Sequence, residues 1–189
     1  MAGSSSHHIR NICVFGGSSP GKEKEFLEST NHLGRVLAER KIHLVYGGGS
    51  LGLMEGVSMA AFLGGSQVLG VVPKALATGD IIGKAIGEEI QVPTMSDRLN
   101  AMFSHADAFI AVPGGLGTLE EIFHISSWAQ LYIHHKPIAR QILISAATAE
   151  QLIDELQSFI PVVDSSMSQL NLSITERRKK LRLDLSLSL

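Results

Sequence analysis

The sequence predicts an α/β fold built on a parallel β-sheet. Short apolar runs rich in Val and Ile alternate with longer amphipathic stretches, which is the pattern of successive βαβ units. Glycine-rich turns follow three of these runs, at residues 16–21, 47–52 and 114–117. Because ligands of parallel sheets bind at the carboxyl ends of the strands, we expect these three turns to lie together around a site.

Each element is predicted from its periodicity and from the residues that begin or end it. The first helix places Phe26 and Leu33 on one face, Gly64 ends the second helix, and Thr148 is the expected cap of the last. The predicted order is strand 12–15, helix 22–40, strand 42–46, helix 51–63, strand 68–72, a glycine-rich loop at 74–89, helix 95–106, strand 108–112, a helix to about residue 132, an apolar run at 142–144 and a helix to about residue 159.

The composition is that of a globular and nearly neutral protein. Hydrophobic residues make up 44% of the 189, and the formal net charge of −2 gives no support to a nucleic-acid or membrane partner. Cys13 is the only cysteine, so an internal disulfide is excluded. We expect a disordered N-terminus at 1–9, a single domain at 10–160, a mobile C-terminal tail at 161–189, and a cytoplasmic location.

The stretch at 113–121, PGGLGTLEE, is the most informative part of the chain. It follows an apolar run and opens a helix, so its glycines and free N–H groups would suit a phosphate. Glu121, one turn into the helix, would then lie close to whatever carries that phosphate. A structural alternative stays open, because Thr118 and Glu121 also have the spacing of a capping box, and the two roles are compatible.

Arg98 is the most informative cation. It is predicted early in the helix that leads into the strand at 108–112. One interpretation makes it a phosphate or transition-state partner that faces Glu121. Two others remain: Arg98 lies on a solvated helix face, or it forms an ion pair with Asp97 next to it.

Several other kinds of site lack support in the sequence. Residues 47–52 fit the glycine pattern of a dinucleotide-binding turn, but no acidic residue follows at the distance of about 20 positions that this pattern requires. No Walker-type phosphate loop is present. The eight histidines show no metal-ligand spacing, so we expect no metal and no nicotinamide cofactor.

Two motifs carry a resemblance to a known family. YGGGSLGLM at 46–54 together with PGGLGTLEE at 113–121 resembles the LOG ("Lonely Guy") family of cytokinin riboside 5′-monophosphate phosphoribohydrolases, some of which older descriptions called lysine decarboxylases. WAQL at 128–131 and HHKP at 134–137 also resemble the plant members. The likeness covers residues 10–138, and 139–160 more loosely.

The resemblance implies a Rossmann-like parallel sheet with helices on both faces, in a homodimer without a cofactor. The implied reaction splits the N-glycosidic bond of a nucleoside 5′-monophosphate into an N6-modified adenine and ribose 5-phosphate. Arg98 and Glu121 would be the catalytic residues, with Glu121 binding ribose and assisting the attacking water. The resemblance also implies a set of substrate-binding residues: Gly17, Ser18, Gly48, Gly49, Met95, Gly114, Gly115, Leu116, Gly117 and Thr118.

The chain departs from the family pattern at two places. The family commonly reads M-H-x-R-K around the arginine, whereas this chain has Ser96 and Leu99 in place of the histidine and the lysine. After Ile138 about 30 residues of the family pattern are absent, which corresponds to one βα unit. We therefore expect a less stable form of the fold, unless residues 142–145 occupy the vacant position in the sheet.

Two other functions remain open. The chain could bind a nucleotide or a phosphate without catalysis, as an inactive variant. It could also be an interaction protein, because residues 181–189 alternate leucine with other residues and resemble the EAR-type repression motif of plant regulators. The basic run RRKK at 177–180 would then favour nuclear import, which makes the nucleus the alternative location.

Overall fold

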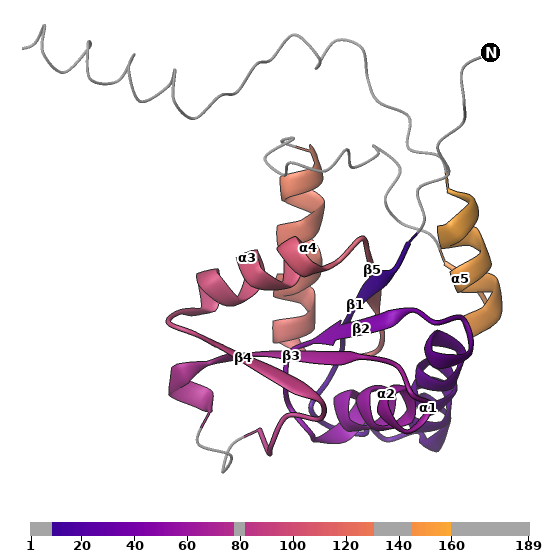
Figure 1. Ribbon diagram of the computed structural model, residues 1–189, viewed down its shortest axis with the longest axis horizontal. Helices are drawn as coiled ribbons and strands as arrows, with labels where there is room; N and C mark the ends of the chain where they lie inside the picture. Colours follow the sequence, from indigo (N-terminus) through magenta and orange to yellow (C-terminus); the bar gives the residue numbers. More distant parts are fainter. Residues whose placement is uncertain (1–8, 78–81, 131–144, 160–189) are drawn as a thin grey trace, which may run out of the picture.

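The structure is a computed structural model that describes residues 9–77, 82–130 and 145–159 (Figure 1). Within these residues a parallel sheet has the strand order β4-β3-β2-β1-β5. The strands are β1 Asn11–Phe15, β2 His43–Tyr46, β3 Val68–Pro73, β4 Glu88–Val92 and β5 Ala108–Ala111. The helices are α1 Lys24–Glu39, α2 Gly52–Leu63, the short 3₁₀ helix η1 Lys74–Leu76, α3 Met95–His105, α4 Leu116–Gln130 and α5 Ala149–Ser158.

Two hydrophobic cores cover the two faces of the sheet. Along β1, Ile12 and Val14 face the core formed with α1, α2 and α5, whereas Cys13 and Phe15 face the core formed with α3 and α4. Figure 1 shows α3 and α4 on one side of the sheet and α1 and α2 on the other. The expected Rossmann-like sheet with helices on both faces is therefore confirmed, and its strands are apolar on both sides because both sides are covered.

The strand order reverses between β1 and β5. From β1 the chain adds β2, β3 and β4 on one side and then returns to place β5 on the other. At this point the turns after β1 and β5 are joined, because Gly17 N–H donates to Pro113 O at 3.0 Å and Val112 N–H donates to Phe15 O at 2.9 Å. Such a reversal opens a crevice at the carboxyl ends of the strands, which is where doubly wound folds bind ligands.

The sequence analysis missed β4. A loop was expected at 74–89, but residues 74–76 form η1 and β4 begins at Glu88. In β4 the glutamates and Gln91 are exposed and only Val92 is buried, so the strand has no apolar run to signal it. Its place at the edge of the sheet explains this composition, since one side of an edge strand faces solvent.

The last helix begins as expected. Thr148 Oγ1 accepts the Gln151 N–H at 3.3 Å, which confirms the predicted cap at the start of α5. The apolar run at 142–144, the junction after Ile138 and the tail at 161–189 lie outside the described residues. Among the described helices none is long and apolar enough to cross a membrane.

Candidate active site

A cavity of about 470 Å³ lies at the reversal of the strand order. Its walls come from the turns after β1, β2 and β5, from the first turns of α3 and α4, and from residues that follow β3. The three glycine turns predicted from the sequence therefore meet around one cavity. The wall is largely apolar, and its charged residues among those described are Arg98, Glu120 and Glu121.

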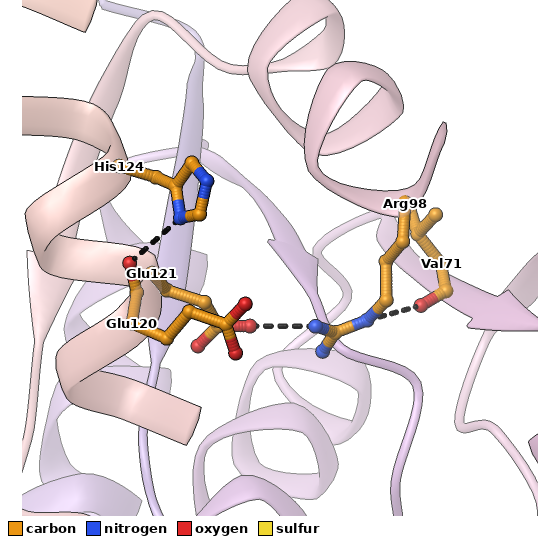
Figure 2. Close-up of polar contacts among 5 residues, drawn as sticks. All are labelled: Val71, Arg98, Glu120, Glu121 and His124. Atoms are coloured by element: carbon orange, nitrogen blue, oxygen red, sulfur yellow. Dashed lines mark hydrogen bonds and ion pairs between the residues drawn. The ribbon is translucent and has the colours of Figure 1, made fainter. Parts of the chain in front are cut away.

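Arg98 and Glu121 form a buried ion pair inside this cavity. Arg98 Nη1 lies 2.7 Å from Glu121 Oε1, and their side chains are only 14% and 10% exposed. Figure 2 shows Arg98 reaching from α3 toward Glu121 on α4, while Arg98 Nε donates to Val71 O on β3 at 3.1 Å. The guanidinium also lies against Gly47, where any side chain would collide with it.

The ion pair decides between the interpretations of Arg98. Asp97 is not its partner, because the Asp97 carboxylate accepts the Thr94 hydroxyl at 2.7 Å and its N–H donates to Thr94 Oγ1 at 3.1 Å. Thr94 and Asp97 thus cap the start of α3. A solvated helix face is also wrong, since Arg98 is largely buried.

Burial makes Glu121 a harder group to ionise than an ordinary glutamate. Desolvation raises its pKa, attraction to Arg98 lowers it, and the charge of Glu120 raises it, with a net rise above the usual 4.5. Glu121 Oε2 accepts no hydrogen bond from any other described residue. That oxygen is therefore free to meet a sugar hydroxyl or a water in the cavity.

The beginning of α4 has the character of an anion site. Each other α-helix in the described ranges carries an acid in its first turn, namely Glu25, Glu55, Asp97 and Glu150, whereas α4 has none. The partial positive charge of its free N–H groups is therefore left without a negative side chain. These groups belong to residues that line the cavity.

The capping-box alternative for Thr118 is wrong. α4 begins at Leu116, so Thr118 is already the third helical residue, and the first bond inside the helix runs from Leu119 N–H to Gly115 O at 3.2 Å. Glu121 is engaged by Arg98 instead. Thr118 has no hydrogen-bond partner among the described residues, so its hydroxyl can serve a ligand.

Most of the substrate-binding residues implied by the resemblance line the cavity. They are Gly17, Ser18, Gly49, Met95, Gly115, Leu116, Gly117 and Thr118. Gly48 and Gly114 are absent from its wall. A Cβ at Gly48 would collide with Val72, and one at Gly114 would collide with Thr118, so these two glycines permit close packing behind the site.

Sequence reasoning missed much of the apolar wall. Pro73 at the end of β3, and Leu76 and Ile82 in the segment after it, line the cavity, and no motif marks them. Leu99, which stands where the family commonly has lysine, is 5% exposed and packs with Met102 and Phe103 while also lining the cavity. Arg98 is therefore the only cation among the described wall residues.

Comparisons with known proteins identify the family of the chain. A family model described as "Possible lysine decarboxylase" matches residues 54–163, more than half of the chain. A probable cytokinin riboside 5′-monophosphate phosphoribohydrolase of Oryza sativa subsp. japonica, LOGL3, is 42% identical over 191 residues, covering 86% of this chain and 90% of the rice protein. The chain belongs to the LOG family.

Other relatives extend the comparison. The cytokinin riboside 5′-monophosphate phosphoribohydrolase LOG7 of Arabidopsis thaliana is 43% identical, covering 86% of this LOG-family chain and 88% of that protein. The molybdenum cofactor carrier protein of Chlamydomonas reinhardtii has a similar structure, with a TM-score of 0.53 and 28% identity over 78% of this chain and 83% of that one. A molybdenum cofactor binding protein of Rippkaea orientalis shares the fold, with a TM-score of 0.60 at 21% identity over 80% of this chain and 96% of that one.

The lengths of these alignments bear on the missing segment. The match to the rice protein spans 191 positions, yet 86% of this 189-residue chain is only about 163 residues. About 28 positions of the rice protein therefore have no counterpart here, close to the predicted gap of one βα unit. The location of the gap after Ile138 remains a prediction.

We expect the gap to lower the stability of the fold. A strand and helix contribute several buried apolar side chains of about 1.5–3 kcal/mol each, against a total stability of about 5–15 kcal/mol for a domain. Insertion of the matching segment of the rice protein after Ile138 should raise the midpoint and the slope of chemical denaturation. Equal midpoints and slopes for the two forms would show that the shorter chain is as stable as the longer one.

Proposed function

We propose that this chain hydrolyses the N-glycosidic bond of cytokinin riboside 5′-monophosphates. Water is the second reactant: its hydroxyl joins C1′ of ribose 5-phosphate, and its proton goes to the departing base. The observation that carries the proposal is the Glu121 carboxylate, held by Arg98 in a cavity that is also lined by the acid-free start of α4. The curated LOG relatives bear the name of this activity.

The phosphate is proposed to bind at the start of α4. Gly115, Leu116 and Gly117 offer main-chain N–H groups there, and Thr118 adds a hydroxyl. A Cβ at Gly115 or Gly117 would meet nothing within 4 Å, so the space over this turn is open to a ligand. Because Arg98 is engaged with Glu121, the phosphate charge would be met mainly by the helix start.

Glu121 is proposed to act on the sugar. Cleavage of the bond between C1′ and the base nitrogen builds positive charge on the ribose ring, as in glycoside hydrolysis. A carboxylate fixed in a largely buried position stabilises such charge strongly. Glu121 Oε1 is held by Arg98, which leaves Oε2 to face the ribose or the attacking water.

The description of the family model as a lysine decarboxylase fits the cavity less well. A decarboxylase that forms a Schiff base needs a lysine at the reacting centre. Among the described residues that line the cavity there is no lysine. Binding without catalysis is the second candidate, and it is favoured by Leu99, which replaces the lysine common in the family.

The homodimer implied by the family likeness is proposed to form through α4. Leu116, Leu119 and Phe123 lie at helical spacing on this helix and are 86%, 47% and 69% exposed. Apolar side chains gathered on one helix face are typical of a protein interface. Leu116 also lines the cavity, so this interface would adjoin the site. The cytoplasmic location, with the nucleus as its alternative, remains a prediction.

Replacement of Glu121 by Gln should separate catalysis from folding. The amide keeps the shape and can still accept from Arg98, but it cannot stabilise positive charge on the ribose. We expect release of the base to fall about 10²–10³-fold, the usual loss for one electrostatic catalytic group. The measurement is release of adenine-type base from N6-substituted adenosine 5′-monophosphates by purified protein.

A matched control is Glu28→Gln, the same change at an exposed site on α1. It should leave turnover within about twofold. Nucleotide binding without any turnover in the unaltered protein would favour the non-catalytic binder. Equal losses of activity and of melting temperature in Glu121→Gln would assign Glu121 a structural role.

The raised pKa of Glu121 predicts the pH dependence of the reaction. The carboxylate must be ionised to act, so kcat/KM should fall on the acid side with a midpoint above 4.5. The folded protein holds this proton more tightly than the unfolded chain does. The free energy of unfolding should therefore fall as the pH rises from 4.5 through the raised pKa of Glu121. Both effects should be missing in Glu121→Gln, which rate profiles and denaturation at several pH values can check.

The α4 interface can be tested by a charge. Phe123→Glu should convert a dimer of twice 20.3 kDa into a monomer, because a carboxylate would be buried at the centre of the apolar face. Phe62→Glu is the control, since Phe62 is 50% exposed on α2. Light scattering after gel filtration gives the masses. An unaltered protein that is monomeric at high concentration would refute the interface.

A further inference from the structure

Tyr46 makes an unusual pair of hydrogen bonds at the end of β2. Its side chain is 0% exposed, and its hydroxyl accepts the Ile86 N–H at 2.6 Å and donates to Ile86 O at 3.3 Å. One phenol thus satisfies both main-chain groups of a residue 40 positions away. Tyr46 also directly precedes the glycine turn that lines the cavity.

Gly70 leaves the space that the Tyr46 ring needs. The two residues are partners in the register of β2 and β3, so their side chains would lie on the same face of the sheet. A Cβ at Gly70 would come within 3.3 Å of Tyr46 Cε1 and 3.2 Å of the Ala85 Cβ. The ring therefore lies beside β3 and reaches the segment that precedes β4.

That segment, residues 82–87, is held to the same glycine turn at its other end. Ser50 N–H donates to Ile82 O at 2.8 Å, and a Cβ at Gly49 would lie 3.6 Å from the Ile82 Cβ. Ile82 lines the cavity, as Gly49 does. The segment is thus fixed by Ser50 at its first residue and by Tyr46 near its last.

Ile82 and the proposed phosphate site at the start of α4 lie on different sides of the point where the strand order reverses. Ile82 packs on the turn after β2, whereas Gly115 and Thr118 follow β5, and β1 separates these two strands in the sheet. A nucleotide with its phosphate at the start of α4 would extend its base across the cavity toward β2 and β3. Ile82 would then meet the base rather than the phosphate.

We propose that Tyr46 is a positioning residue for substrate binding, which holds residues 82–87 against the glycine turn so that Ile82 forms a wall for the base. The inference rests on the proposed function for the identity of the ligand. The hydrogen bonds do not depend on pH near neutrality, because burial raises the pKa of Tyr46 above 10.0 and the hydroxyl stays protonated.

The test uses Tyr46→Phe, which removes only the hydroxyl. Loss of its two bonds to Ile86 should raise KM for an N6-substituted adenosine 5′-monophosphate by about fivefold or more, because one ordinary hydrogen bond alone is worth about fivefold. The kcat value should change less than about twofold, because Glu121 and Arg98 are untouched. The dissociation constant for ribose 5-phosphate, which lacks the base, should also stay within about twofold.

Thr30→Val is the matched control. Thr30 is 1% exposed, and its hydroxyl donates to Phe26 O and Leu27 O within α1, away from the cavity. The control removes a buried hydroxyl, so it should lower the melting temperature without changing KM. An equal rise of KM in both variants would show a general loss of stability and would overturn the role of Tyr46.

Hydrogen exchange gives a readout that does not need turnover. In Tyr46→Phe the Ile86 amide loses its acceptor, so exchange over residues 82–87 should become faster while β1 and β5 stay protected. Unchanged exchange there, or unchanged KM with intact turnover, would refute the proposal. Absence of turnover in the unaltered protein would instead refute the proposed function, and the exchange would still decide whether Tyr46 fixes the segment.

Discussion

The buried pair of Arg98 and Glu121 is the interaction on which the layout of the site depends. It joins α3 to α4 across the carboxyl ends of the strands, and β3 contributes through Val71 O. Desolvation outweighs attraction for Glu121, because its pKa is raised despite the guanidinium. Ionisation of Glu121 in the folded protein therefore costs stability, and removal of Arg98 alone would leave this carboxylate buried without its partner. Arg98→Ala would therefore lower the stability of the fold as well as alter the site.

Close approach of side chains to the main chain is the second constraint, and it explains two of the glycines near the site. Gly47 admits the Arg98 guanidinium, and Gly70 admits the Tyr46 ring. A side chain at Gly47 would displace the Arg98 guanidinium. The glycines of this chain thus have two uses: some leave main chain open to a ligand, and others leave room for the side chains around the cavity.

The sequence predicted the fold and the grouping of its glycine turns well, because both depend on local signals. Apolar runs followed by glycine turns gave β1, β2, β3 and β5, and the structure gathers their turns around one cavity. β4 was missed because an edge strand carries charged residues on its open side. The pairing of Arg98 with Glu121, 23 positions apart, could be suspected but not fixed, since Asp97 was an equally good partner by sequence. Tyr46 begins the YGGGSLGLM motif, but its contact with Ile86 could not be predicted, because a buried tyrosine in a strand is ordinary until its hydroxyl is seen to reach another segment.

The predicted gap and the candidate site lie in different parts of the chain. Every described residue of the cavity wall precedes the predicted junction after Ile138, so the loss of a βα unit removes no described group from the reacting centre. Its effect would act on β5, which ends the described sheet and carries the turn that leads into α4. A strand that is paired on one side holds that turn less firmly. A shortened chain of this kind would therefore keep the chemistry of Glu121 while binding the phosphate less tightly, so that KM suffers more than kcat.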